Sequence, residues 1–333
     1  MTMTRRTFLA GASVVAIAPA FPAFLRRAHA ATTLTLGHGA VPGNPRALAA
    51  ERFAALVLEK TQGAVRINIA GAEQLGSDAA MLTSLRTGVL DFSINSQGAT
   101  AAVAPELNAL GLPFLFRDPA HALAILKGPI GNELAERLQK RGLVALDWWD
   151  NGVRHVTNSK RPILTPPDLA GMKIRVPADA MLMDVFRALN ASPEQIAFGE
   201  LYLALQQGVV DGQENPLANI ASSKLYEVNA FISLTGHVWQ SNPFLMARMA
   251  QGKVGQPELA AIREAAVEAG LMQHQLMHDT NEKLAQTLQD FPGVKINEVD
   301  RPAFQQATSA IAEQWKKKPF GDLITQLMDQ AAQ

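Results

Sequence analysis

Apolar and polar positions along the chain follow two spacings. Alternation at every second position, typical of strands, occurs in residues 34–37, 65–69, 89–94 and 172–176. Apolar residues at helical spacing occur in residues 45–62, 77–87, 180–189 and 199–207. Helix and strand therefore alternate from residue 34 onward, which predicts an α/β fold with helices layered on sheet.

One pattern occurs twice. LRTGVLDFSIN at 85–95 and LQQGVVDGQEN at 205–215 both end a predicted helix at glycine and continue through Val-x-Asp into a strand. This spacing predicts two similar α/β lobes rather than one large sheet. The strand-like run NPFLMARM at 242–249 is placed to cross back to the first lobe.

Residues 256–290 carry one long helical pattern of Ala, Leu, Met, Glu and Gln. A helix of about 35 residues spans about 50 Å, which is more than one lobe requires. Unless Gly270 interrupts it, we expect this helix to span both lobes.

The first thirty residues resemble an export signal. Thr-Arg-Arg-Thr-Phe-Leu at 4–9 fits the twin-arginine type, an apolar stretch follows at 11–25, and Ala-His-Ala at 28–30 is a small-x-small cleavage site. The stretch is short for a membrane span, so a retained anchor is the weaker alternative. We expect cleavage near Ala30 and a periplasmic location.

Charge and cysteine content exclude several classes of protein. Residues 1–30 hold four of the 30 basic side chains and no acid, which leaves 26 basic against 30 acidic ones. No basic run predicts a nucleic-acid surface. The chain has no cysteine, which excludes disulfides, thiolate zinc sites, iron–sulfur clusters and cysteine nucleophiles.

The sequence lacks the common catalytic motifs. No G-x-S-x-G, H-E-x-x-H or P-loop occurs, and we expect no enzymatic activity and no cofactor. His274, His278 and Glu282 share a face of the predicted long helix, and this spacing can hold a metal. A solvated polar stripe is the interpretation we favour, and an exported metal-dependent enzyme stays as the alternative.

Two arginines and an asparagine follow or occupy predicted strands. If the segments of Arg154, Arg175 and Asn215 are neighbouring strands, their side chains meet at one sheet edge, where α/β proteins bind ligands. The planar guanidinium matches a carboxylate in bidentate fashion. Aromatic walls such as Phe198 or Trp149 would exclude water. The alternative is two exposed arginines and a capping asparagine.

Four segments around these residues resemble the solute-binding proteins of tripartite ATP-independent periplasmic (TRAP) transporters. The matching motifs are GVRHVT at 152–157, KIRVP at 173–177, AFGELYLALQ at 197–206 and DGQENP at 211–216. QLGSDAAML at 74–82 and LPF at 112–114 resemble landmarks of the first lobe in that family. The resemblance covers nearly all of the chain after residue 30.

The resemblance implies a two-lobed periplasmic-binding-protein fold with a hinge and a long spanning helix. Residues 31–151 and 241–280 are expected to form lobe I, and 152–240 and 281–333 lobe II. Such a protein, expected as a monomer, closes on a small organic acid and delivers it to an integral membrane permease. The periplasmic input protein of a sensor system would use the same fold and stays an alternative.

Positions matched to the family motifs imply roles in binding. Arg175 would make the principal salt bridge to the ligand carboxylate, and Arg154 would assist it. Asn215 would donate an amide hydrogen bond, and Phe198 would pack against the ligand body.

Two departures from the sialic-acid-binding relatives narrow the solute. Those relatives read hydroxyls with a first-lobe glutamate, where this chain has Ser96, and carry an asparagine where this chain has Ala178. Both differences argue against sialic acid. Asp78, Ser96 and Trp149 remain candidates for contacting the rest of an acid whose identity stays open.

Overall fold

The computed structural model describes residues 31–333, so the expected export signal lies outside the described residues. Its strands are β1 (Thr32–His38), β2 (Val65–Ala70), β3 (Phe92–Ile94), β4 (Leu143–Asn158), β5 (Lys173–Val176), β6 (Ser192–Gln195), β7 (Gly212–Asn215), β8 (Phe231–Ala247) and β9 (Lys295–Asn297). Its α-helices are α1 (Pro45–Lys60), α2 (Asp78–Arg86), α3 (Gln97–Ala101), α4 (Pro119–Leu126), α5 (Pro129–Gln139), α6 (Ala180–Ala188), α7 (Phe198–Gln206), α8 (Leu217–Ser222), α9 (Gln256–Thr287), α10 (Arg301–Thr308), α11 (Ala310–Trp315) and α12 (Gly321–Ala331). The alternation of helix and strand predicted from periodicity is confirmed.

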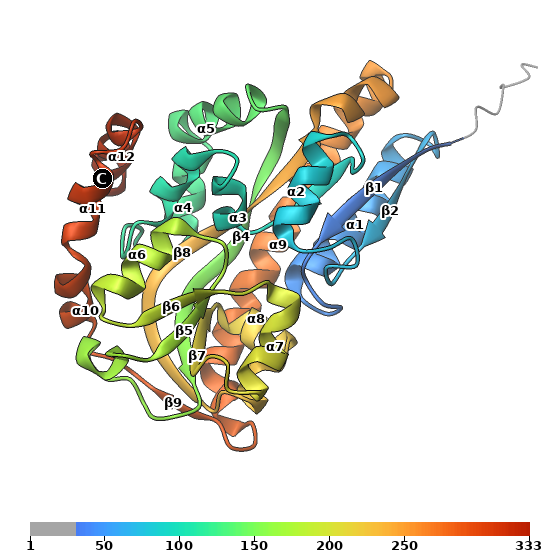
Figure 1. Ribbon diagram of the computed structural model, residues 1–333. Helices are drawn as coiled ribbons and strands as arrows, with labels where there is room; N and C mark the ends of the chain where they lie inside the picture. The colour runs from blue at the N-terminus through green and yellow to red at the C-terminus, as the bar shows by residue number, and fades with distance from the viewer. Residues whose placement is uncertain (1–30) are drawn as a thin grey trace, which may run out of the picture. The chain divides into compact units, whose positions relative to one another are not determined.

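The strands form one hydrogen-bonded sheet in the order β2-β1-β3-β8-β4-β7-β5-β6, with β9 beside β8 (Figure 1). Three short strands therefore lie on each side of the long pair β8 and β4. We call β1, β2 and β3 with α1 and α2 the first half, and β5, β6 and β7 with α6 and α7 the second half. In each half a central strand pairs in parallel with two others, and one of these pairs antiparallel with a long strand, β8 or β4.

The expectation that the two halves would not share a sheet is wrong. Strands β4 and β8, of 16 and 17 residues, pair antiparallel along most of their length and join the halves through the middle. Their register shifts at three places, the central one between Asp150 and Gly152. Such irregularities bend a strand and increase its twist, so both strands change direction where they pass between the halves.

The repeated Val-x-Asp pattern has a structural role. In the first half Asp91 Oδ2 accepts a hydrogen bond from Thr35 N of β1 at 2.8 Å. In the second half Asp211 Oδ2 accepts one from Lys173 N of β5 at 2.9 Å. Each aspartate therefore ties the turn before its own strand to the neighbouring parallel strand, which explains why the pattern occurs in both halves.

Helix α9 has 32 residues, a length of about 48 Å, and Gly270 does not interrupt it. It packs beside α1 of the first half and beside α8, and it crosses β4 between them (Figure 1). A Cβ on Gly270 would lie 1.9 Å from Asp147 Oδ2, so this glycine permits the close packing. Next to it, the Gln273 amide bonds Asp150 N at 2.8 Å and Asp150 O at 2.6 Å, and so replaces a strand partner at the irregular position.

An aromatic cluster anchors the core of the first half. The Phe53 ring packs edge-on against Phe92 at 5.6 Å and against Phe244 of β8 at 4.7 Å. The C-terminal helices α10 and α11 pack on α6, and α12 packs on α4. Within residues 31–333 no helix combines the length and apolar character needed to cross a membrane.

Candidate functional site

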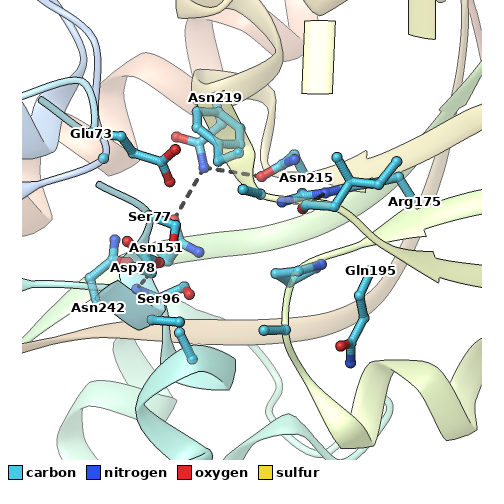
Figure 2. A pocket seen from close by; sticks show the side chains of 18 of the residues that line it. Glu73, Ser77, Asp78, Ser96, Asn151, Arg175, Gln195, Asn215, Asn219 and Asn242 are labelled. Carbon is cyan, nitrogen blue, oxygen red and sulfur yellow. Dashed lines mark hydrogen bonds between the residues drawn. The ribbon is translucent and has the colours of Figure 1, made fainter. Parts of the chain in front are cut away.

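A cavity of about 210 Å³ opens between loops of the first half and strand ends of the second half (Figure 2). It is lined by Gly39, Arg46, Glu73, Ser77, Asp78, Ala79, Ser96, Ala99, Asn151, Arg154, Arg175, Pro177, Ala178, Gln195, Ile196, Ala197, Phe198, Asn215, Asn219 and Asn242. The structure thus brings together six of the seven side chains predicted to bind a ligand: Arg175, Arg154, Asn215, Phe198, Asp78 and Ser96.

Arg175 lies on β5 beside the end of β7, and its side chain is 2% exposed. Its Nε donates to Ile196 O at 2.8 Å, and its guanidinium lies 5.8 Å from the centre of the Phe198 ring. Among residues 31–333 no acceptor bonds its two terminal nitrogens. Burial lowers the pKa of Arg175 to about 10, so the side chain stays cationic at neutral pH.

Arg154 is bound differently. It lies on β4, and its guanidinium donates hydrogen bonds from two nitrogens to the carboxylate of Glu214 on β7. The bond from Nη2 to Oε1 is 2.7 Å long. The same nitrogen donates to Glu214 O at 2.8 Å. Burial acts to raise the pKa of Glu214, but the charge and hydrogen bonds of Arg154 outweigh it and the pKa is lowered. The charge of Arg154 is therefore balanced by Glu214, and its side chain is held in place where it lines the cavity.

Asn215 begins a chain of amide side chains that crosses the cavity wall. Its Oδ1 accepts from Asn219 Nδ2 at 3.2 Å, and Asn219 also donates to Asn151 Oδ1 at 3.2 Å. From the first half, Asn44 Nδ2 donates to Asn219 Oδ1 at 2.9 Å. Because Asn215 donates to Gln213 Oε1 at 2.5 Å, one of its two amide hydrogens is already used.

Asp78 and Ser96 occupy the opposite wall, in the first half. Asp78 is the first residue of α2, where a carboxylate suits the helix dipole, and its Oδ2 accepts from Ser96 N at 2.9 Å. Figure 2 shows both residues facing Arg175 and Asn215 across the cavity. They are thus placed to contact the part of a solute far from Arg175.

Two charged residues of this wall were missed from the sequence. Arg46, in the first turn of α1, donates from Nη1 to Asn242 Oδ1 at 3.1 Å and to Ile94 O at 3.3 Å. Burial lowers its pKa, opposed by the nearby carboxylates of Asp78 and Glu73. A cation in the first turn of a helix opposes the helix dipole, and this was a readable signal that Arg46 has another role.

Glu73, the other missed residue, follows β2. Its Oε2 accepts a hydrogen bond from Gly199 N of α7 at 2.8 Å, so it reaches across to the second half. Burial raises its pKa, which the bond from Gly199 partly offsets. No sequence signal marks it, because its position depends on a left-handed turn formed by non-glycine residues, Ala72 and Glu73 itself.

The structure does not bring Trp149 to the cavity. The indole is fully buried in the core, 5.0 Å from the Phe244 ring and close to Gly270 of α9. It belongs to the contact between β4 and α9. We therefore do not count it among the residues that contact a solute.

The histidine face of α9 does not assemble a metal site. His274 Nε2 lies 3.0 Å from Trp148 O on the side that packs on β4, while His278 is exposed and lies 3.5 Å from Glu282. Within residues 31–333 no group of three or more His, Cys, Asp or Glu side chains is arranged to hold a metal ion.

Comparison with known proteins finds one matching family model and close relatives. Residues 36–318 match the family model described as bacterial extracellular solute-binding protein, family 7. A protein of Sinorhizobium fredii named y4mM is 59% identical over 319 residues, which cover 96% of this chain. The chain spans only 59% of the length of that relative.

Solved structures of similar proteins contain small acids. The sugar acid-binding protein DctPAm of Advenella mimigardefordensis, in complex with galactonate, superposes with a TM-score of 0.88 at 31% identity, covering 91% of this chain and 98% of that one. A TRAP periplasmic solute-binding protein of Sulfurospirillum deleyianum with bound succinate gives a TM-score of 0.85 at 32% identity, covering 90% of this chain and 99% of that one.

Proposed function

The chain belongs to family 7 of the bacterial extracellular solute-binding proteins, and on that premise we propose that its solute carries one carboxylate and several hydroxyl groups. The protein is a TRAP solute receptor for small organic acids and not an enzyme, with the two-lobed fold of its relatives. The exported metal-dependent enzyme is not favoured. What remains to be proposed is which kind of acid it binds and how.

The carboxylate binds Arg175 in this proposal, and one observation carries it. Arg175 and Arg154 are equally buried, at 2% exposed, but only Arg154 is neutralised by a protein carboxylate. Arg175 lines the cavity and donates one nitrogen to Ile196 O, while its other two nitrogens bond no acceptor among residues 31–333. A guanidinium held in this way offers two parallel hydrogen bonds to a carboxylate, each contributing about 1.5–3 kcal/mol.

The residues on the opposite wall of the cavity favour a solute with hydroxyl groups at the end far from its carboxylate. Glu73 and Asp78 both line the cavity there, and Arg46 beside them balances only one of the two negative charges. Carboxylates accept hydrogen bonds from hydroxyls and repel a second carboxylate. A sugar acid such as galactonate fits this arrangement better than succinate does. Ser96 and the free amide hydrogen of Asn215 complete the polar contacts, with Phe198 against the carbon chain.

The remaining expectations follow from the family as proposals. Residues 1–30 are a twin-arginine export signal cleaved near Ala30, and the mature protein is a periplasmic monomer that delivers its solute to integral membrane permease subunits. Lobe I comprises residues 31–151 and 241–280, and lobe II comprises 152–240 and 281–333. The long strands β4 and β8 pass between the lobes and supply the hinge.

A thermal-shift series with matched compounds tests the solute class. Galactitol has the hydroxyl groups of D-galactonate without its carboxylate, and succinate has carboxylates without hydroxyls. We expect D-galactonate to raise Tm, because a ligand at 100 times its Kd stabilises the folded state by about 2.7 kcal/mol. We expect galactitol to have no effect and succinate a smaller one. A shift with succinate as large as that with D-galactonate would contradict the proposal.

A further inference from the structure

Helix α7 lacks a capping side chain of its own at the end that faces the cavity. Its N-cap residue is Ala197, which has no side-chain oxygen to accept from the first amides of the helix. The corresponding helix of the first half, α2, is capped by its own Ser77, whose hydroxyl accepts from Ala80 N at 3.4 Å. The two halves therefore treat the same structural position differently.

Glu73 supplies the missing acceptor from the other side of the cavity. Gly199 N, at the second position of α7, donates to Glu73 Oε2 at 2.8 Å across 126 positions of sequence. A carboxylate at a helix N-terminus satisfies a free amide and interacts favourably with the helix dipole. The first half thus caps a helix of the second.

The backbone on both sides is shaped for this contact. A Cβ on Gly199 would lie 2.6 Å from Glu73 Oε2, so a larger residue here would push the carboxylate away from the amide. On the other side Ala72 and Glu73 have φ of +51° and +58°, a conformation disfavoured for non-glycine residues. Hydrogen bonds from their amides to Ala40 O at 3.0 Å and His38 O at 3.2 Å hold this turn.

We propose that Glu73 keeps the cavity closed over its solute by capping α7 across the two halves. The contact exists only when the halves are together, so it stabilises the closed conformation relative to the open one. It also fixes Phe198, the first residue of α7, beside Arg175. Glu73 therefore controls how long the solute stays, while Arg175 recognises its carboxylate. The proposal rests on the proposed function only in that a solute occupies this cavity.

Two substitutions remove the contact from opposite sides. Glu73→Ala deletes the acceptor, and Gly199→Ala blocks its approach while leaving every charge of the cavity in place. Alanine is a better helix former than glycine, so Gly199→Ala should leave the fold intact. Glu200→Ala serves as the matched control, because Glu200 is an exposed acid in the same helical turn that reaches no residue of the first half.

Stopped-flow release of D-galactonate measures the effect. We expect Gly199→Ala to release the solute roughly 2- to 30-fold faster, the range that corresponds to loss of a helix cap, with little change in the association rate. Glu73→Ala should release it at least as fast, because it also removes an acceptor for the solute hydroxyls. The double variant should release the solute no faster than Glu73→Ala, because Gly199→Ala removes only a bond that Glu73→Ala has already removed. Unchanged release in Gly199→Ala, or fully additive effects in the double variant, would overturn the proposal.

A second measurement needs no solute. Since the chain has no cysteine, Glu59→Cys and Arg187→Cys introduce dye sites on exposed positions of α1 and α6. Single-molecule energy transfer then gives the closed fraction, which we expect to fall in Glu73→Ala and Gly199→Ala and to stay unchanged in Glu200→Ala. If D-galactonate fails to bind the unaltered protein, the proposed solute class is wrong, and the closed fraction alone decides the role of Glu73; equal fractions in all variants overturn it.

Discussion

The two halves of the sheet have the same arrangement of strands, but they carry different residues at equivalent positions. Asp91 accepts a hydrogen bond from Thr35 N on β1, and Asp211 accepts the equivalent one from Lys173 N on β5. Two residues further along each strand, β1 has Gly37 and β5 has Arg175. A Cβ on Gly37 would lie 2.8 Å from Met81 Sδ, so α2 packs where a side chain would need space. In the second half Arg175 extends over Phe198 at the start of α7. The same frame is thus used once for packing and once for binding.

The halves also differ in when their binding groups become fixed. Arg154 and Arg175 are held by Glu214 and Ile196 O, partners from their own side of the cavity. Glu73 is held by a bond from the opposite side. The two arginines of the second half are therefore organised before closure. In the first half Asp78 is also held from its own side, by Ser96 N, whereas Glu73 is fixed only on closure. Preorganised groups bind with a smaller loss of conformational freedom, so we expect the first encounter of the solute to be with the second half.

The largest effect is expected from Arg175. Arg175→Ala should weaken binding of D-galactonate at least ~100-fold, because two charge-assisted hydrogen bonds are lost. Arg175→Lys should weaken it more than ~10-fold, since an ammonium lacks the planar fork. Isothermal titration measures both affinities.

Lys173→Ala is the matched control for that series. Lys173 lies on the same strand but is exposed, so its removal should leave affinity unchanged. Equal losses in Lys173→Ala and Arg175→Ala would show that a general positive field, and not a bidentate clamp, attracts the acid.

The next largest effect is expected on stability, when the buried ion pair of Arg154 and Glu214 is broken. Glu214→Gln leaves the buried guanidinium of Arg154 without a counter-charge, which should lower the free energy of unfolding by about 3–5 kcal/mol. Combining it with Arg154→Met should recover part of that loss, since no unpaired charge remains. Urea denaturation compares the variants; a double variant less stable than Glu214→Gln would show that the ion pair is not the source of the effect.

The repeated aspartates allow the two frames to be compared directly. Asp91 is buried and also accepts from Lys253 Nζ at 2.6 Å, so Asp91→Ala should cost about 1–3 kcal/mol of unfolding free energy. Asp211 is partly exposed, and Asp211→Ala should cost only about 0.5–1 kcal/mol, because water can replace the carboxylate there. Equal costs in denaturation would mean that solvent access does not distinguish the halves.

The smallest effect on binding is expected at Trp149. Trp149→Phe should lower the free energy of unfolding by about 1–3 kcal/mol, since the indole is fully buried between β4 and α9. The affinity for D-galactonate should stay within twofold. A tenfold loss of affinity with unchanged stability would return Trp149 to the binding site.

Local sequence patterns predicted most elements of the fold. Strand alternation and helical spacing depend on neighbouring residues alone, so β1, β5, α1 and the full length of α9 were predicted close to their observed bounds. The condition set for Arg154, Arg175 and Asn215 is met, since they lie on the neighbouring strands β4, β5 and β7, but alternation alone did not predict this neighbourhood. The joining of both halves into one sheet depends on pairing between β4 and β8, about 90 residues apart, which no local pattern encodes.

The misplaced and missed residues have related causes. Irregular register in β4 near Asp150 interrupts the alternation from which the facing of Trp149 would be inferred. Glu73 reaches the cavity through a turn with positive φ at two non-glycine residues, which sequence preferences disfavour. Arg46 was detectable only as a cation at the wrong end of a helix.

A crystal structure of the protein with D-galactonate tests the division of labour between the halves most directly. We predict that the two carboxylate oxygens lie about 3 Å from Nη1 and Nη2 of Arg175, with the hydroxyl groups directed to Glu73 and Asp78. A solute bound in reverse, with its carboxylate on Arg46 and its hydroxyls on Arg175, would contradict the account.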